Sequence, residues 1–163
     1  MVGSDSLPSF DVTRPDGSVP VVTDIISLRI NYDTMKSEGG GGSTGKTATG
    51  LTLLSEKPLS PEKVAAYSFE FPDYKVHFDP DLAASIGLRA PIAQGAMSVS
   101  WIAGEIAKGG AIDTLDMSVT FRQPIFWDEH VKVYAQDAEN FAIANSADEI
   151  CSMGNLQSVT YQA

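Results

Sequence analysis

The chain is poor in cysteine, histidine and positive charge. A single cysteine, Cys151, excludes an internal disulfide, and two histidines without cysteine partners argue against a structural zinc site. Lys and Arg number 11 against 21 Asp and Glu, so the formal net charge is −10. Because nucleic-acid phosphates and anionic lipid surfaces attract clustered Lys and Arg, this charge argues against binding to either.

Long hydrophobic runs are missing as well. No segment approaches the roughly 20 apolar residues that a membrane-spanning helix needs. Residues 1–10 have neither the basic start nor the apolar run of a signal peptide, so we expect a cytoplasmic protein. The length of 163 residues and the hydrophobic content of 43% are typical of one domain with an ordinary packed core.

Residues 1–20 contain three prolines and are expected to form an extended or loose entry segment. Residues 24–35 alternate hydrophobic and polar side chains with a period of two, which predicts a strand. Residues 50–55 are predicted to return as a second strand and to close a long hairpin. Between them, residues 38–50 are rich in Gly and Ser, which is typical of a mobile loop. Composition alone leaves open whether this loop is a hairpin tip, a lid or a linker.

The Gly-rich segment also contains a misleading motif. Residues 40–47 satisfy the G-x-x-x-x-G-K-T pattern of a phosphate-binding loop. That motif requires a buried parallel strand before it and a helix after it. Here the preceding strand is amphipathic, and residues 47–50 (TATG) are a weak helix start. We therefore interpret the segment as a loop and not as a nucleotide site.

The remainder of the chain predicts helices followed by strands. Residues 61–67 and 81–86 are predicted as short helices, and residues 95–108 as a longer helix that is apolar all round and therefore buried. Strands are predicted at 114–122, with Leu115, Met117, Val119 and Phe121 on one face, and at 130–136, 141–145, 149–153 and 156–161. The expected architecture is α+β, with an antiparallel sheet wrapped around one buried central helix.

Three segments of the sequence resemble a known family. Residues 59–68 (LSPEKVAAYS), 76–107 (VHFDPDLAASIGLRAPIAQGAMSVSWIAGEIA) and 114–136 (TLDMSVTFRQPIFWDEHVKVYAQ) are similar to the MaoC-like dehydratases and hydratases, the relatives of (R)-specific enoyl-CoA hydratases. This resemblance implies the hot-dog fold. It assigns residues 56–163 to a hot-dog domain and leaves residues 1–55 as an N-terminal extension.

The resemblance implies a catalytic pair, His77 and Asp73, and a turn into the central helix at Gln94-Gly95. These motifs differ from the family pattern at two places. The usual Asp-x-Asn-Pro-Ile/Leu-His is replaced by residues 73–77 (DYKVH), which lack the Asn and are one residue shorter, and the usual His-Gly is Gln-Gly.

These residue types suit the hydration or dehydration of an acyl thioester. An imidazole titrates near pH ~6.5, so His77 can take or give a proton, while Asp73 is expected to orient the ring or hold the water. The backbone N–H of Gly95, at the positive end of the central helix, is expected to bind the thioester oxygen. The Gln94 side chain either binds substrate or caps the helix. Candidates to line the pocket are Met97, Trp101, Tyr74 and Phe78.

Three functions remain open from the sequence. The favoured one is a lyase that acts on a coenzyme A or carrier-protein thioester, whose phosphates would be met by Lys75, Arg89, Lys108, Arg122 and Lys132. The second is a diverged cyclase, isomerase or dehydratase that acts on a free small molecule in a biosynthetic, polyketide-like pathway. The third is a non-catalytic hot-dog dimer partner or ligand-binding protein. The resemblance implies a homodimer or larger homo-oligomer, and no metal or redox cofactor.

Overall fold

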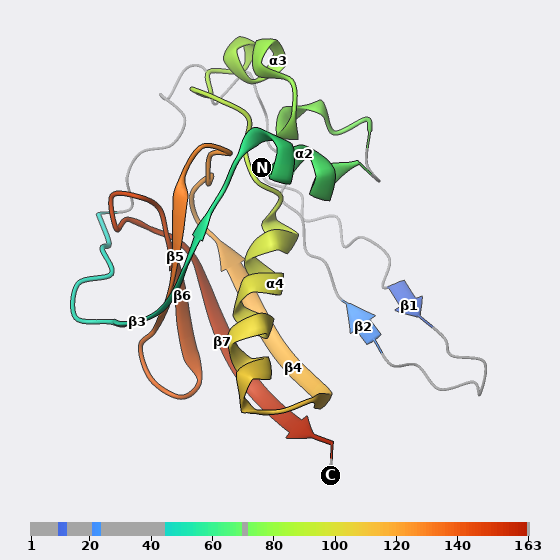
Figure 1. Cartoon of the computed structure of the whole chain (residues 1–163), viewed down its shortest axis with the longest axis vertical. Helices are drawn as coiled ribbons and strands as arrows, with labels where there is room; N and C mark the ends of the chain where they lie inside the picture. The colour runs from blue at the N-terminus through green and yellow to red at the C-terminus, as the bar shows by residue number, and fades with distance from the viewer. Residues whose placement is uncertain (1–9, 13–20, 24–44, 70–71, 163) are drawn as a thin grey trace, which may run out of the picture.

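A five-stranded antiparallel sheet carries one long helix across its face (Figure 1). The computed structural model describes residues 10–12, 21–23, 45–69 and 72–162. The strand order is β3-β5-β6-β7-β4, with bounds Thr52–Pro58, His130–Ala135, Asn140–Ala144, Ile150–Tyr161 and Ile112–Phe121. A separate antiparallel pair is formed by β1 (Phe10–Val12) and β2 (Val21–Thr23).

Short helices form a layer beyond the start of the long helix α4 (Figure 1). Two of them begin with a capping side chain followed by proline. Before the helix that starts at Pro61, the Ser60 hydroxyl accepts from the Lys63 N–H. Before the helix that starts at Pro80, the Asp79 carboxylate accepts from the N–H groups of Asp81 and Leu82. The helical elements are α2 (Pro61–Ser68), η1 (Lys75–His77), α3 (Pro80–Ser85), α4 (Gly95–Ile106) and η2 (Ala107–Gly109).

One face of α4 packs directly on the sheet. Its buried residues are Met97, Ser98, Ile102, Glu105 and Ile106. The two elements approach closely at Gly154 of β7, where an added Cβ would lie 2.6 Å from Cδ1 of Ile102. Ile102 is only 1% exposed, so the surrounding core leaves its side chain little room to move aside.

The buried central helix expected from the sequence is observed as α4, but its burial is confined to one face. Gly95, Ala96, Ser100 and Gly104 are exposed. The sheet covers only the face that bears the large side chains, and the small residues turn away from it. The apolar composition of the helix hid this division, because Gly, Ala and Ser add little hydrophobicity to either face.

From residue 112 onward the strands are predicted correctly in type, with one difference in number, whereas β1 and β2 were not predicted. Residues 149–153 and 156–161 belong to the single strand β7, which pairs with β6 along its first half and with β4 along most of its length. The intervening Gly154 does not end the strand, because its missing side chain makes room for Ile102.

The strand predicted at 50–55 is observed as β3, residues 52–58. Its partner among the described residues is β5, so β3 forms one edge of the main sheet. The sheet thus takes residues from both sides of the expected boundary between residues 55 and 56. The strand predicted at 24–35 and residues 38–44 of the Gly-rich loop lie outside the described residues.

The loop interpretation of the G-x-x-x-x-G-K-T motif is confirmed where the structure describes it. Thr47 forms an isolated β-bridge with Glu149, and the Ala48 N–H donates to the Asp148 carbonyl at 2.9 Å. The chain then turns and enters β3, so the helix that a phosphate-binding loop requires does not follow Lys46.

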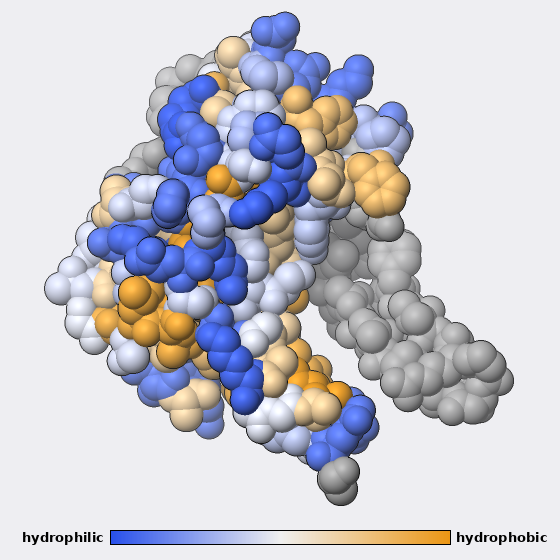
Figure 2. Space-filling view, viewed as in Figure 1, coloured by the Kyte–Doolittle hydropathy of each residue, from blue (hydrophilic) through white to orange (hydrophobic). Residues whose placement is uncertain are grey.

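The surface is largely polar. Figure 2 shows hydrophilic residues over much of the visible face, with a small hydrophobic area over the start of β3, where Leu53 is 47% exposed. Within the described ranges, no helix is long and apolar enough to cross a membrane.

The contact between α4 and β7 makes a stability prediction. Gly154→Ala is expected to lower the free energy of unfolding by about 1 kcal/mol or more, because the new methyl group overlaps Cδ1 of Ile102 in a packed core. Chemical denaturation measures the change. In an Ile102→Val background, which lacks that Cδ1 atom, the same substitution should cost less. Equal costs in both backgrounds would contradict the contact.

Candidate active site

His77 is tied to the segment that leads into α4. Its Nδ1 lies 2.8 Å from the carbonyl oxygen of Ile92, and the Ile92 N–H donates to the Val76 carbonyl at 3.2 Å. Ile92 also forms a β-bridge with Phe126. Because a carbonyl oxygen only accepts, Nδ1 carries the ring proton of the neutral imidazole. Nε2 is therefore left with the basic lone pair.

The surroundings of His77 favour its neutral form. The ring is half-buried, and burial lowers the pKa of His77, although the hydrogen bond to Ile92 opposes this shift. The net direction is downward, so the imidazole is neutral and basic at pH 7. A neutral imidazole with a free Nε2 is suited to act as a general base.

The start of α4 offers unpaired backbone donors. Gln94 occupies the N-cap position with extended backbone, and its side chain makes no capping hydrogen bond, so the capping role considered for it is not observed. The N–H groups of Gly95 and Ala96 have no acceptor among the described residues. Two hydrogen bonds fix the preceding turn, from the Ala93 N–H to Ile125 and from the Trp127 N–H to Pro91. Such a helix end favours a negatively charged oxygen.

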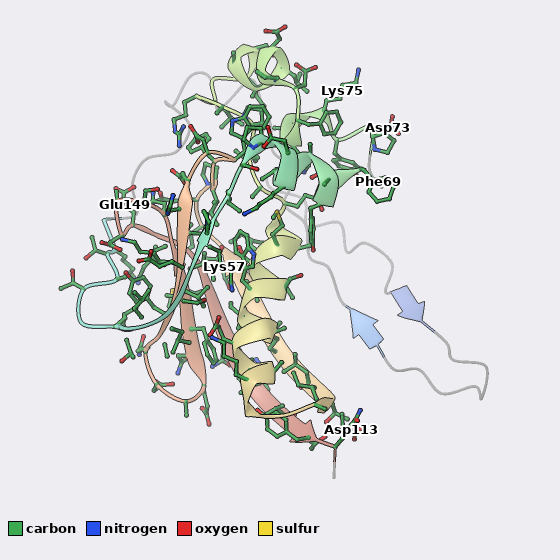
Figure 3. All side chains as sticks on the ribbon, in the orientation of Figure 1. Lys57, Phe69, Asp73, Lys75, Asp113 and Glu149 are labelled. Carbon is green, nitrogen blue, oxygen red and sulfur yellow. The ribbon has the colours of Figure 1, made fainter. Side chains whose placement is uncertain are left out.

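Asp73 lies apart from the His77 hydrogen bond. It is exposed in the loop before η1, and Figure 3 shows it with Lys75 at the outer edge of the helical layer. It helps to line a cavity of about 260 Å³ with Tyr74, Lys75, Val76, Leu82 and Ile86. The Ile92 carbonyl, not Asp73, orients the imidazole. Of the two roles expected for Asp73, only holding the water stays a prediction.

The structure does not bring the four pocket-lining candidates together. Tyr74 shares the cavity with Asp73, whereas Phe78 is half-buried next to His77 in the chain and lines neither of the two described cavities. Met97 is buried in the core beneath α4, and Trp101 packs against the same core. A tunnel along Met97 and Trp101 stays a prediction.

A second cavity, of about 240 Å³, lies beside an ion-paired arginine. Arg89 donates two hydrogen bonds to the Asp128 carboxylate at 2.8 and 2.9 Å and one to Glu129 at 3.0 Å. Its guanidinium also lies 4.0 Å from the centre of the Phe126 ring. The cavity is lined by Gly87, Leu88, Arg89, Gln123, Pro124, Phe126, Asn145 and Glu149. The charge of Arg89 is thus already neutralised within the chain.

Most of the basic residues expected to meet phosphates are likewise engaged. Lys108 pairs with Glu105, and Lys132 pairs with Asp148 at 2.8 Å. With Arg89, three of the five candidates are therefore committed to internal ion pairs. Lys75 and Arg122 are exposed and have no ion pair to a described carboxylate.

Sequence reasoning missed two parts of this region. The Ile92 carbonyl that orients His77 is a backbone group, and no side-chain motif signals it. The other is Phe121, whose ring lies against Gly95 at the start of α4. The alternating pattern of β4 placed Phe121 on the inner face of the sheet, but it carried no sign that this position reaches the helix start.

Comparison with known proteins gives a likeness of structure without a likeness of sequence. No family model matches the chain, and no curated protein matches its sequence. HtdX from Mycobacterium tuberculosis matches 99% of this chain and 68% of its own with a TM-score of 0.61 at 16% identity. The (R)-hydratase from A. caviae matches 74% of this chain and 100% of its own, with a TM-score of 0.55 at 21% identity.

A third solved structure is similar to this chain. The MaoC-like dehydratase from Rhodospirillum rubrum matches 69% of this chain and 91% of its own, with a TM-score of 0.55 at 11% identity. The five-stranded sheet and the helix across it are the parts expected of such a fold. The chain therefore has the hot-dog fold of the MaoC-like hydratases and dehydratases.

Proposed function

We propose that the protein is a lyase that hydrates an enoyl thioester or dehydrates a β-hydroxyacyl thioester. The observation that carries this proposal is the 2.8 Å hydrogen bond from His77 Nδ1 to the Ile92 carbonyl. It holds a basic imidazole on the segment that opens α4, three residues before the unpaired N–H of Gly95. A base and an oxyanion donor at one helix end are what this reaction needs.

In the dehydration direction, His77 Nε2 takes a proton from the α-carbon of the substrate. Negative charge develops on the thioester oxygen and is stabilised by the Gly95 N–H at the helix end. The β-carbon–oxygen bond then breaks, and the imidazolium gives its proton to the departing hydroxyl, which leaves as water. Asp73 is assigned the task of holding that water. Hydration follows the same steps in reverse.

Removing the base tests the proposal. His77→Gln retains an N–H donor for the Ile92 carbonyl but lacks a basic nitrogen, so turnover of a 2-enoyl thioester should fall by about 10²- to 10⁴-fold. The loss of the thioester's ultraviolet absorbance measures hydration. His130→Gln, at the exposed other histidine, should leave the rate unchanged. A folded His77→Gln protein with wild-type turnover would sink the assignment.

The pH profile supplies a second readout of the same residue. Because burial lowers the pKa of His77, the base stays unprotonated down to below pH ~6.5, and kcat/KM should fall only under that value. The free energy of unfolding should depend on pH in the same direction as kcat/KM. Protonation of His77 is disfavoured in the folded state, so the stability that His77 contributes declines as pH falls below ~6.5.

A second candidate function is the same acid–base chemistry on a free small molecule. It is favoured by the ion pairs that neutralise Arg89, Lys108 and Lys132. Coenzyme A and the phosphopantetheine of carrier proteins both carry phosphates, which need exposed cations. Of the five candidates, only Lys75 and Arg122 lack an ion pair to a carboxylate in the described part of the chain.

Truncating the thioester separates the two candidates. If coenzyme A thioesters are substrates, Lys75→Ala or Arg122→Ala should raise KM for the enoyl-CoA about tenfold and leave the enoyl N-acetylcysteamine thioester, which lacks phosphates, within about twofold. Steady-state kinetics at fixed ionic strength measures both. Equal effects on both thioesters, or none, would favour the free small molecule.

We also propose that the chain forms a homodimer. Among the described residues β4 is an edge strand of the main sheet, and α4 leaves Ala96, Ser100 and Gly104 exposed. An open edge strand with ten residues is a template for pairing, and small side chains allow close approach of a second copy.

A large side chain at Gly104 tests this dimer. A Cβ there meets nothing within 4 Å in the single chain, so Gly104→Arg should leave the protomer folded and block association. Light scattering after size exclusion is expected to show a dimer for the wild type and a monomer for the variant. Ala138→Arg, in the exposed β5–β6 turn, is the control and should remain dimeric. A dimeric Gly104→Arg protein would exclude this face from the interface.

A further inference from the structure

Phe121 is the last residue of β4, and it is more exposed than the residues that precede it on the same face. Leu115, Met117 and Val119 are partly buried and pack against the core, whereas Phe121 is 53% exposed. The end of β4 lies next to the start of α4 (Figure 1). Its ring therefore projects to the helix end and not into the core.

The ring tip lies directly against Gly95. A Cβ added at Gly95 would be 3.0 Å from Cζ and 3.1 Å from both Cε atoms of Phe121. All three nearest atoms belong to this one ring, so its leading edge faces the first residue of the helix. Even a methyl group at position 95 would press on it. The aromatic ring thus lies beside Gly95, whose N–H is one of the donors without an acceptor among the described residues.

We propose that Phe121 determines the substrate specificity of this site and restricts it to short acyl groups. The inference rests on the proposed function, in which the thioester oxygen binds the Gly95 N–H. In this arrangement the acyl carbons next to a carbonyl held there pack beside the ring, which lies against Gly95. Hydrophobic walls of this kind discriminate by about tenfold or more for one methylene group.

The contact itself is tested without any substrate. Gly95→Ala should lower Tm by about 2–4 °C in the wild type, because the new methyl group meets the ring, and should not lower it in the Phe121→Ala background. Equal shifts in both backgrounds would show that the ring does not lie against Gly95, and they would overturn the proposal at its base.

The specificity is tested with a four-carbon and an eight-carbon 2-enoyl thioester. Wild-type kcat/KM should favour the shorter substrate, and Phe121→Ala should shift the ratio at least tenfold toward the longer one. Phe121→Leu keeps an apolar side chain of smaller reach and should give an intermediate ratio. Phe69→Ala removes a second exposed phenylalanine, 73% exposed at the end of α2, and should leave the ratio unchanged (Figure 3). Circular dichroism confirms that each variant is folded.

The outcomes separate this inference from the proposed function. Suppose that the protein hydrates the thioesters, but Phe121→Ala changes the ratio of kcat/KM between the four- and eight-carbon substrates by less than about twofold. The proposed lyase function then stands, and the proposed role of Phe121 is overturned. If the wild type hydrates neither thioester, the proposed function fails. The role of Phe121 is then decided by the binding affinities of the saturated four- and eight-carbon thioesters. A tenfold shift in their ratio upon Phe121→Ala supports the inference, whereas an unchanged ratio or no binding overturns it.

Discussion

The seating of α4 on the sheet is the constraint on which the rest of the structure depends. Ile102 and Gly154 allow the helix to approach β7 closely, and Glu105 secures it to the edge strand β3. The Ser55 hydroxyl donates to the buried Glu105 carboxylate at 2.6 Å, and Lys57 lies 3.6 Å away between β3 and α4 (Figure 3). Burial raises the pKa of Glu105, but the Lys108 and Ser55 hydrogen bonds outweigh it and the net direction is downward. With the helix fixed in this way, Gly95 is fixed too.

Internal ion pairing explains how an acidic chain uses its few cations. A buried carboxylate without a partner is costly, and here Glu105 is paired with Lys57 and Lys108, and Glu129 with Arg89. Arg89 holds together the turn before β5 through Asp128, Glu129 and Phe126. The same turn anchors the segment that leads to Gly95, through Ile125 and Trp127. Fewer positive charges are therefore left for an anionic ligand.

Much of the fold could be read from the sequence, because hydrophobic periodicity and capping signals are local. Ser60-Pro61, Asp79-Pro80 and the alternation along β4 gave the right element types and nearly the right bounds. The exposed face of α4 could not be predicted, since which side a sheet covers is a tertiary property. The same holds for the engagement of Arg89 with residues about 40 positions away, and for the separation of Asp73 from the His77 hydrogen bond. The proposed catalytic roles stay predictions.

The hydrogen bond between His77 and Ile92 has a consequence for how such proteins diverge. Its acceptor is a main-chain carbonyl, and the proposed oxyanion donor at Gly95 is a main-chain amide. Neither group is itself a side-chain atom, so substitutions can accumulate around them while the path of the backbone is kept, although the ring of Phe121 leaves little room for a side chain at position 95. A scaffold built this way can be preserved while its sequence drifts to the 11–21% identity seen with the matching structures. The fold is then detectable by comparison of structures where comparison of sequences finds no match.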